Sequence, residues 1–186
     1  MTRKQPTHPW RRFRRRRYER AGQLWRDLGT VLGQRRRIRD GAAGTALAPA
    51  FRERLLLVVT AVNHCRYCAD FHIQAAARSG ITPAEARWLL AGAVDACPAH
   101  EIPALLYAQQ WAARDGAADT TARAELVAQY GPALTSEIEL ALGVIWVGNL
   151  LGNTVQRGCV SCALPSPAGL ADRRLRFQVT KGAEHP

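Results

Sequence analysis

The stretch NHCRYCADFH, residues 63–72, carries the most specific pattern in this sequence. Its two cysteines, Cys65 and Cys68, are three residues apart, so their sulfur atoms lie on the same face of a helix. His72 lies four residues beyond Cys68 and falls on that same stripe. An imidazole one helical turn from a thiol can take up the thiol proton or stabilise the thiolate. We therefore interpret the segment as a helix that presents two thiols and a base on one side.

The expected start of this helix makes the thiols more reactive. Asn63 is a favourable N-cap residue, which would place Cys65 in the first turn, where unpaired backbone N–H groups favour an anionic sulfur. The thiolate is the nucleophilic form of cysteine. One thiolate would attack the O–O bond of a hydroperoxide and become a sulfenic acid, and the second cysteine would condense with it to a disulfide. An external dithiol would then reduce the pair by exchange.

Other roles for the cysteines stay open on the sequence alone. A purely structural disulfide is a weak alternative, because so short a loop constrains the unfolded chain little. A zinc site would need Cys159 and Cys162 as well, but zinc ribbons usually separate their cysteine pairs by about 15 to 20 residues, far fewer than here. Buried, unreactive thiols are a third alternative. We favour redox chemistry without a metal or a bound cofactor, and we expect Cys97 to be a lone thiol.

The pattern after Pro49 is helical throughout. Apolar residues recur at helical spacing, Gly and Pro fall at helix-like intervals, and no segment alternates with a period of two. Thr82 and Glu85 form a capping box with proline between them, and Ser136 with Glu139 forms a second one. The sequence predicts a compact, multi-helix, all-α domain with helices over residues 51–62, 65–78, from 82 onward, 102–114, 122–130 and 136–155.

The charge of the chain is concentrated at its N-terminus. The formal net charge is +11, from 26 basic and 15 acidic residues. Residues 1–45 hold 14 of the basic residues and three of the acidic ones, so the remainder of the chain is balanced. Trp25, Leu28 and Leu32 within this part have helical spacing. We expect a basic, partly disordered or helical extension over residues 1–45, a helical domain over 46–165 and a C-terminal tail over 166–186.

The basic extension predicts an anionic partner in two alternative ways. Its arginines, interleaved with Trp10, Phe13 and Tyr18, would neutralise the phosphates of a nucleic acid and stack on its bases. Alternatively, the amphipathic portion over residues 18–32 would lie on an anionic membrane surface. A solvated extension without such a partner is the simplest alternative.

The sequence also predicts a location in the cell. No stretch approaches the roughly 20 apolar residues that span a bilayer. The Arg-rich start lacks the apolar core of a secretion signal, because Arg26 and Asp27 interrupt its apolar residues. Two cysteine pairs at CxxC spacing are atypical of a secreted disulfide framework. We therefore expect a cytoplasmic protein.

The spacing around the cysteines resembles that of a known family. Glu53, eleven intervening residues, Cys65-Arg66-Tyr67-Cys68, three further residues and then His72 resemble the signature of the alkylhydroperoxidase D-like branch of the carboxymuconolactone decarboxylase family. The resemblance covers roughly residues 47–157 and includes the region of Asn149 and Asn153.

The resemblance implies an all-helical fold, trimers or hexamers of identical chains, and an antioxidant peroxidase activity that cycles through a disulfide. By the resemblance, Cys68 attacks the hydroperoxide, Cys65 resolves the intermediate, and Glu53 with His72 forms a proton relay. Tyr67 stands where the best-studied members carry a histidine, and we include it among the candidate catalytic residues.

Glu53 has further support from its own surroundings. Its helical stripe contains Leu56, Leu57 and Thr60 and is largely apolar, which favours burial of the carboxylate beside a partner. A surface ion pair with the neighbouring arginines is the alternative. Two other functions stay open for the chain. One is a lactone-acting enzyme of the decarboxylase branch, which generally lacks the CxxC pair, and the other is a weakly active or inactive helical module that its basic extension localises.

Overall fold

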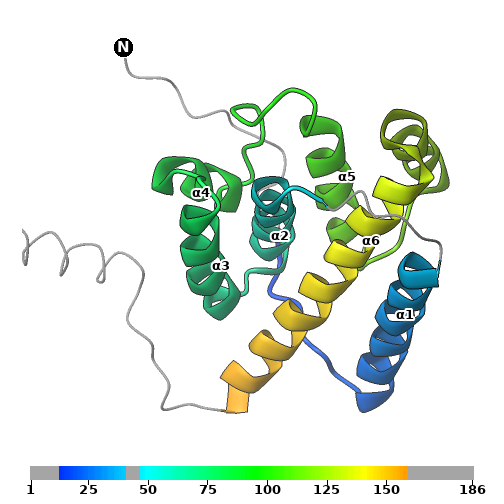
Figure 1. The fold of residues 1–186 in the computed structure, drawn as a ribbon. Helices are drawn as coiled ribbons and strands as arrows, with labels where there is room; N and C mark the ends of the chain where they lie inside the picture. The colour runs from blue at the N-terminus through cyan, green and yellow to red at the C-terminus, as the bar shows by residue number, and fades with distance from the viewer. Residues whose placement is uncertain (1–12, 41–46, 159–186) are drawn as a thin grey trace, which may run out of the picture. The chain divides into compact units, whose positions relative to one another are not determined.

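The computed structural model describes residues 13–40 and 47–158, and all the regular secondary structure in this part of the chain is helical (Figure 1). The prediction of an all-α fold is confirmed. The helices are α1 (Ala21–Asp40), α2 (Pro49–Asn63), α3 (Arg66–Arg78), α4 (Pro83–Leu90), α5 (Ile102–Ala113) and α6 (Thr120–Gly158). The described residues up to Val155 form one compact unit. Cys159 and Cys162, which a zinc site would need, lie outside the described residues.

Helix α2 is the central helix of the fold. From Leu55 to Asn63 every residue is buried, because the helix is apolar all round. It packs against α3, α4 and α5, which lie around it (Figure 1). Glu53 lies near the start of this central helix and is buried with it, 5% exposed.

The turn between α2 and α3 differs from the prediction. Asn63 does not cap α3; it is the last residue of α2, and His64 ends that helix in the left-handed conformation, with φ 51°. Cys65 is the N-cap of α3, and its Sγ accepts the backbone N–H of Cys68 at 3.3 Å. Cys68, rather than Cys65, therefore lies in the first turn. The chain changes direction between the two adjacent helices at a residue in the left-handed conformation, and that residue is His64.

Helix α4 begins as predicted. The Thr82 hydroxyl oxygen accepts the backbone N–H of Glu85 at 3.1 Å, and proline occupies the first helical position. This cap fixes where α4 starts after the short turn that follows α3.

Helix α6 is broken where Gly131 and Pro132 predicted a stop. Gly131 has φ 74° and ψ 165°, outside the helical region. The second capping box is wrong, because the helix resumes at once from Pro132, which suits a first turn. Ser136 lies inside this helix and donates its hydroxyl to the carbonyl oxygen of Pro132 at 2.8 Å.

Among the described residues, one segment meets the length and hydropathy criteria for crossing a membrane, contrary to the expectation that none would. It is Thr120–Gln156, and 44% of its most apolar window is buried inside the protein. A core helix of a globular domain meets the same criteria, and the break at Gly131 divides this one. The segment is therefore weak evidence for a membrane span.

The N-terminal part of the chain from Phe13 onward packs on the helical unit. We call residues 13–18 the N-terminal strap. Arg16 donates to Asp115 at 2.5 Å and to the carbonyl oxygen of Ala113 at 2.8 Å. The backbone N–H of Tyr18 donates to the hydroxyl of Thr154 at 3.0 Å. The strap thus joins the turn after α5 to the end of α6.

Helix α1 continues from the strap and lies against α6. The side chains of Tyr18 and Trp146 both donate to Asp27, each at 3.1 Å. The helical spacing of Trp25 and Leu32 predicted a helix correctly, but these two side chains are 71% and 56% exposed. The domain boundaries drawn at residues 45 and 165 stay predictions.

Candidate active site

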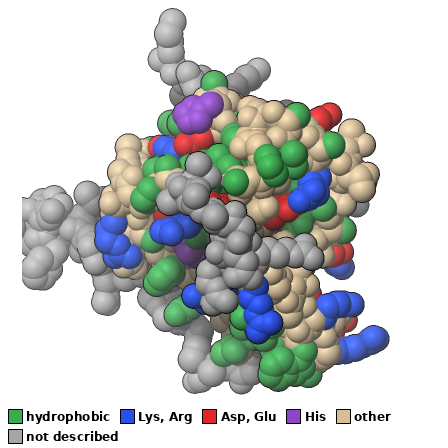
Figure 2. Space-filling view, turned by 45° about the vertical axis from the view of Figure 1, so that its right-hand side comes forward, with side chains coloured by type: hydrophobic (Ala, Val, Ile, Leu, Met, Phe, Trp, Pro, Cys, Tyr) green, Lys and Arg blue, Asp and Glu red, His purple; other side chains and the backbone are tan. Residues whose placement is uncertain are grey.

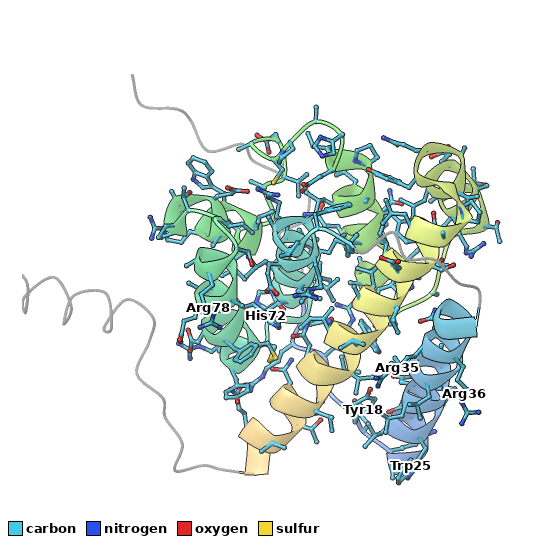
Figure 3. All side chains as sticks on the ribbon, viewed as in Figure 1. Tyr18, Trp25, Arg35, Arg36, His72 and Arg78 are labelled. Carbon is cyan, nitrogen blue, oxygen red and sulfur yellow. A yellow bond between two sulfur atoms is a disulfide. The ribbon has the colours of Figure 1, made fainter. Side chains whose placement is uncertain are left out.

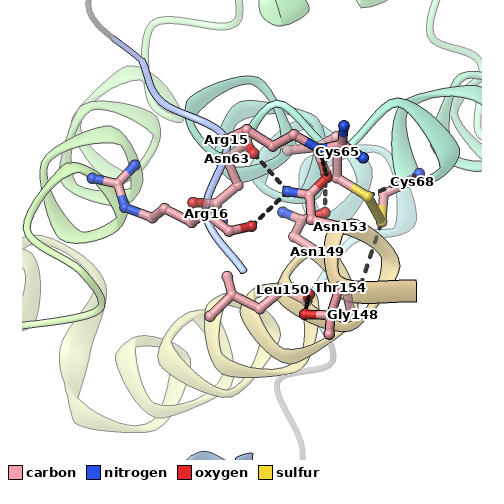
Figure 4. The surroundings of a disulfide bond; sticks show 11 residues. Arg15, Arg16, Asn63, Cys65, Cys68, Gly148, Asn149, Leu150, Asn153 and Thr154 are labelled. Carbon is pink, nitrogen blue, oxygen red and sulfur yellow. Dashed lines mark hydrogen bonds between the residues drawn. A yellow bond between two sulfur atoms is a disulfide. The ribbon is translucent and has the colours of Figure 1, made fainter. Parts of the chain in front are cut away.

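The two cysteines of the CxxC segment are joined in a disulfide at the start of α3 (Figure 4). Both side chains are buried, with 1% of Cys65 and 6% of Cys68 exposed. The disulfide lies against α6, where the Cys68 Sγ is 3.7 Å from the carbonyl oxygen of Gly148. The helix N-terminus, the turn before it and α6 therefore form the immediate surroundings of the sulfur atoms.

Gly152 lets α6 approach the disulfide. A Cβ atom at this position would lie 2.9 Å from the Sγ of Cys65 and 3.4 Å from that of Cys68. Contacts shorter than about 3 Å force the neighbouring atoms to move, and here those atoms are held by their bond to each other. A residue without a side chain is required for this packing.

Replacing Gly152 with alanine is therefore expected to destabilise the oxidised protein by about 1–2 kcal/mol, because overpacking outweighs the gain in helix propensity. Gly148, one turn earlier on α6, is the matched control, since a Cβ there meets nothing within 4 Å. Gly148→Ala should be neutral or stabilising by up to about 1 kcal/mol. Urea unfolding of both variants measures the difference, and equal shifts for the two would show that the close approach is unimportant.

Glu53 and His72 form a buried pair next to this helix start. The Nδ1 of His72 lies 2.9 Å from the Oε2 of Glu53, and the two side chains are only 12% and 7% exposed. Figure 3 shows His72 on the side of α3 that faces α2. The burial of Glu53, predicted from its apolar stripe, is confirmed. When Nδ1 carries the proton and donates to the carboxylate, Nε2 is the atom left to exchange a proton with another group.

The structure brings together some of the candidate residues and not others. His72 lies one helical turn from Cys68, but within the described residues no hydrogen bond joins its ring to either sulfur. The Tyr67 side chain is 58% exposed, and no hydrogen bond joins it to the pair among the described residues. The structure thus contains a disulfide at the start of α3 and a Glu–His pair that joins α2 to α3, with Tyr67 outside both. The roles assigned to the individual residues stay predictions.

A cluster of buried polar side chains lies behind the disulfide and was not predicted as part of the site (Figure 4). The Thr60 hydroxyl donates to the Oδ1 of Asn149 at 3.2 Å. The Nδ2 of Asn153 donates to the carbonyl oxygen of Asn63 at 2.9 Å and to that of Arg16 at 2.7 Å. The cluster therefore ties α2, α6 and the strap together around the sulfur atoms.

Several amide atoms of this cluster have no hydrogen-bond partner among the described residues. They are both side-chain polar atoms of Asn63 and the Nδ2 of Asn149, and both residues are fully buried. Buried amide donors left unpaired are costly, so they suggest a site that binds a further polar group. Amide donors of this kind also stabilise negative charge that develops in a reaction.

Cys97 is buried away from the pair and is the free cysteine among the described residues. Burial raises the pKa of its thiol to about 11, and the charge of Glu85 adds to the effect. At pH 8 only about one molecule in a thousand would carry the thiolate. Alkylation of Cys97 by iodoacetamide should therefore be very slow at pH 8 and rise about tenfold per pH unit up to pH 11. Modification at pH 8 as fast as that of free cysteine would contradict this environment.

The described residues contain no cluster of three or more His, Cys, Asp or Glu side chains that would hold a metal ion. The donor atoms that would complete a zinc site with Cys65 and Cys68 belong to residues outside the described ranges. Within these ranges the sulfurs are partnered with each other and with the backbone.

The fold and the site together define a class: an all-helical protein with a CxxC disulfide at a helix N-terminus and a buried pair of a histidine from that helix and a glutamate from the preceding helix. The family model described as the carboxymuconolactone decarboxylase family matches residues 31–114. This segment contains Glu53, both cysteines of the pair and His72, and over these residues the chain is similar to that family. Searches of curated proteins and of solved structures found no significant match.

Proposed function

We propose that the protein is a thiol-dependent hydroperoxide reductase that cycles Cys65 and Cys68 between dithiol and disulfide. The observation that carries the proposal is the disulfide at the start of α3 together with His72, one turn along the same helix, which is paired with Glu53 of α2. The signature shared with the alkylhydroperoxidase D-like branch supports this choice within the family. A hydroperoxide is the oxidising substrate and an external dithiol is the reductant.

In the first step Cys68 acts as the nucleophile. Its position in the first turn of α3 favours the thiolate, and His72 Nε2 takes up the thiol proton while Glu53 stabilises the resulting imidazolium. The thiolate attacks the terminal oxygen of the hydroperoxide and the O–O bond breaks. The products are a Cys68 sulfenic acid and an alkoxide, which takes the proton back from His72 and leaves as an alcohol.

In the second step Cys65 resolves the sulfenic acid. As the N-cap of α3, its sulfur accepts a backbone N–H, which favours the anionic form that attacks. The new S–S bond expels hydroxide, which leaves as water once protonated. A dithiol then donates two electrons, restores both thiols and leaves as a disulfide.

Peroxide consumption in the presence of dithiothreitol tests the proposal. The wild type should turn over, Cys68→Ser should fall to the background rate, and His72→Ala should be slower by about a hundredfold, as for loss of a general acid–base group. Cys97→Ala is the matched control, because it removes a thiol that lies outside the site, and it should retain wild-type activity. Equal activity of the wild type, Cys68→Ser and His72→Ala would refute the proposal.

The family description also supports a second candidate, a lactone-acting enzyme of the decarboxylase branch. Such an enzyme would not need the cysteine pair. This second candidate function predicts that activity on a small lactone survives in a Cys65→Ser/Cys68→Ser variant. The hydroperoxide reductase, in contrast, would lose all peroxide turnover in that variant.

The proposals about partners and location come from the sequence. We propose a homo-oligomer, a trimer or hexamer, which light scattering would measure, and a cytoplasmic location.

In the basic region, Arg14 and Arg16 both pair with Asp115. On the face drawn in Figure 2, basic side chains are interspersed with apolar and acidic ones. Binding of nucleic acid or an anionic membrane by residues 1–45 stays a proposal; deletion of those residues should abolish a salt-dependent interaction with either.

A further inference from the structure

A cavity of about 540 Å³ lies where the N-terminal strap, the start of α1 and the middle of α6 meet. Its size is within the range of cavities that bind small molecules. Neither Cys65 nor Cys68 is among the described residues that line it, so the cavity does not open on the disulfide. We call it the arginine pocket because five arginines line it: Arg14, Arg15, Arg16, Arg17 and Arg26.

Arginine outnumbers acid in this pocket. The excess is two positive charges, because three acidic residues line the pocket beside the five arginines: Glu19, Asp27 and Asp115. Asp115 is shared by Arg14, at 3.6 Å, and Arg16, at 2.5 Å. Helix α1 also begins at the pocket with no acidic residue in its first turn, so the positive end of its dipole adds to the potential.

Three of the arginines keep their guanidinium groups exposed at the pocket. Arg17 is exposed and makes no hydrogen bond or ion pair within the described part of the chain. Arg26 is 72% exposed and lies 3.9 Å from the carboxylate of the adjacent Asp27, and Arg14 is 73% exposed. A guanidinium is suited to a two-point contact with phosphate oxygens, so a ligand with several phosphate groups can pair with more than one of these arginines.

The fold holds these like charges close together. The arginines at 14–17 are consecutive, and neutral partners help to fix the segment that carries them. Arg16 donates to the carbonyl oxygen of Ala113 at 2.8 Å, and the backbone N–H of Tyr18 donates to the hydroxyl of Thr154 at 3.0 Å. Because neighbouring like charges repel each other, a bound polyanion would relieve this repulsion and stabilise the strap.

The wall of the pocket on the side of α6 is apolar. Trp146 and Leu150 form it and are 7% and 6% exposed. The Trp146 ring lies edge-on to that of Trp111, with centroids 5.5 Å apart, and its Nε1 donates to Asp27 at 3.1 Å. Tyr18 donates to the same carboxylate and lies between α6 and α1 (Figure 3). A flat ring of a ligand can therefore lie on a fixed aromatic surface while its charges meet the arginines.

We propose that the arginine pocket binds a nucleotide with two or three phosphate groups. The phosphates pair with Arg14, Arg17 and Arg26, and the base lies against Trp146 and Leu150. A single nucleotide is the occupant because the arginines line one cavity, whereas a nucleic acid requires a basic stripe along the surface. The inference goes beyond the proposed function and does not depend on the redox activity of the cysteine pair.

Calorimetric titration of the full chain with ATP, without Mg²⁺ and at low salt, tests the site. The expected result is saturable binding that weakens at least tenfold between about 0.05 M and about 0.5 M salt. Arg17→Gln should weaken it about tenfold, as for loss of one charge-assisted contact. Arg36→Gln is the matched control: it removes an exposed arginine about 15 Å further along α1 than Arg26 and should change the affinity by less than twofold (Figure 3). Equal weakening in both variants would overturn the site, because the attraction would then come from the overall charge.

A ligand series tests the contact with the base. Tripolyphosphate carries the charge of ATP without its base and should bind about three- to tenfold more weakly than ATP, because a base stacked on an aromatic side chain adds to the affinity. Adenosine, which lacks the phosphates, should show no measurable binding. Tripolyphosphate that binds as tightly as ATP, or adenosine that does so, would contradict the proposed nucleotide.

The competing occupants are the remaining arms of the experiment. Mixed-sequence single-stranded DNA and vesicles that contain an anionic lipid are titrated under the same conditions. If either binds and Arg17→Gln weakens that binding, while ATP gives no heat with the wild type, the arginines belong to a surface for a macromolecule and the nucleotide proposal is wrong. Arg17→Gln should keep wild-type peroxide turnover, so this inference and the proposed function fail independently.

Discussion

Replacing Glu53 with glutamine is expected to lower kcat/KM for hydroperoxide reduction by about a hundredfold, within the range for loss of general acid–base assistance. The side chain keeps its size, and its amide oxygen can still accept a hydrogen bond from the His72 Nδ1, which lies 2.9 Å from the Glu53 Oε2. What it loses is the negative charge that stabilises the imidazolium formed when His72 takes up the Cys68 proton. The measurement is steady-state turnover of a small alkyl hydroperoxide with saturating dithiol.

A control variant separates this effect from a general loss of acidic charge. Glu125→Gln removes one exposed carboxylate from α6 and should leave kcat/KM unchanged. Glu53→Gln should also change the pH dependence of the reaction, since the base it supports would titrate differently. A folded Glu53→Gln variant with activity within twofold of the wild type would exclude Glu53 from the relay.

Replacing Arg54 with leucine is expected to lower the free energy of unfolding by about 3–5 kcal/mol, as for breaking a buried ion pair by removal of one partner. The Arg54 guanidinium donates to Glu85 at 2.6 Å and to Glu101 at 3.0 Å, and the side chains of both arginine and acids are less than one-fifth exposed. Burial alone would lower the pKa of Arg54, but the hydrogen bond to Glu85 and the charge of Glu101 raise it overall. Without the cation, two carboxylates would be left buried together.

Denaturant unfolding of two further variants tests this explanation. Arg54→Leu combined with Glu101→Leu should recover part of the loss, because one of the stranded carboxylates is removed as well. Arg123→Leu breaks an ion pair with Glu139 in which the arginine is 47% exposed, and it should cost no more than about 1 kcal/mol. The same cost for Arg54→Leu and Arg123→Leu would show that burial of the ion cluster is unimportant.

Most of the fold could be predicted from sequence because its helices begin and end at strong local signals. The Thr82 cap, the stop at Gly131 and the apolar run of α2 all act within a few residues. The two errors also concern helix starts. Asn63 and Ser136 are both favourable N-cap types, but His64 and Pro132 determine where the neighbouring helices begin. Residue type alone could not show which of these neighbouring residues marks the start of each helix.

The site was predictable only where its residues share a helix or a motif. Cys65, Cys68 and His72 lie close together in the sequence, and Glu53 was found through its apolar stripe and the family signature. The contacts of Thr60 with Asn149 and of Arg16 with Asn153 join residues 89 and 137 positions apart. No local pattern marks such pairs, so the polar cluster and the strap became visible only in the folded structure. The glycine and asparagine repeat at 148–149 and 152–153 was the one available signal.

The central claim, that Cys68 is oxidised by a hydroperoxide and Cys65 then closes the disulfide, is tested most directly by trapping the sulfenic acid. Reduced Cys65→Ser and Cys68→Ser variants each receive one equivalent of an alkyl hydroperoxide in the presence of dimedone, followed by trypsin and mass spectrometry. The account predicts a dimedone adduct on peptide 67–78 of Cys65→Ser and none on peptide 55–66 of Cys68→Ser. The absence of an adduct in both variants, or an adduct on Cys65 alone, would contradict it.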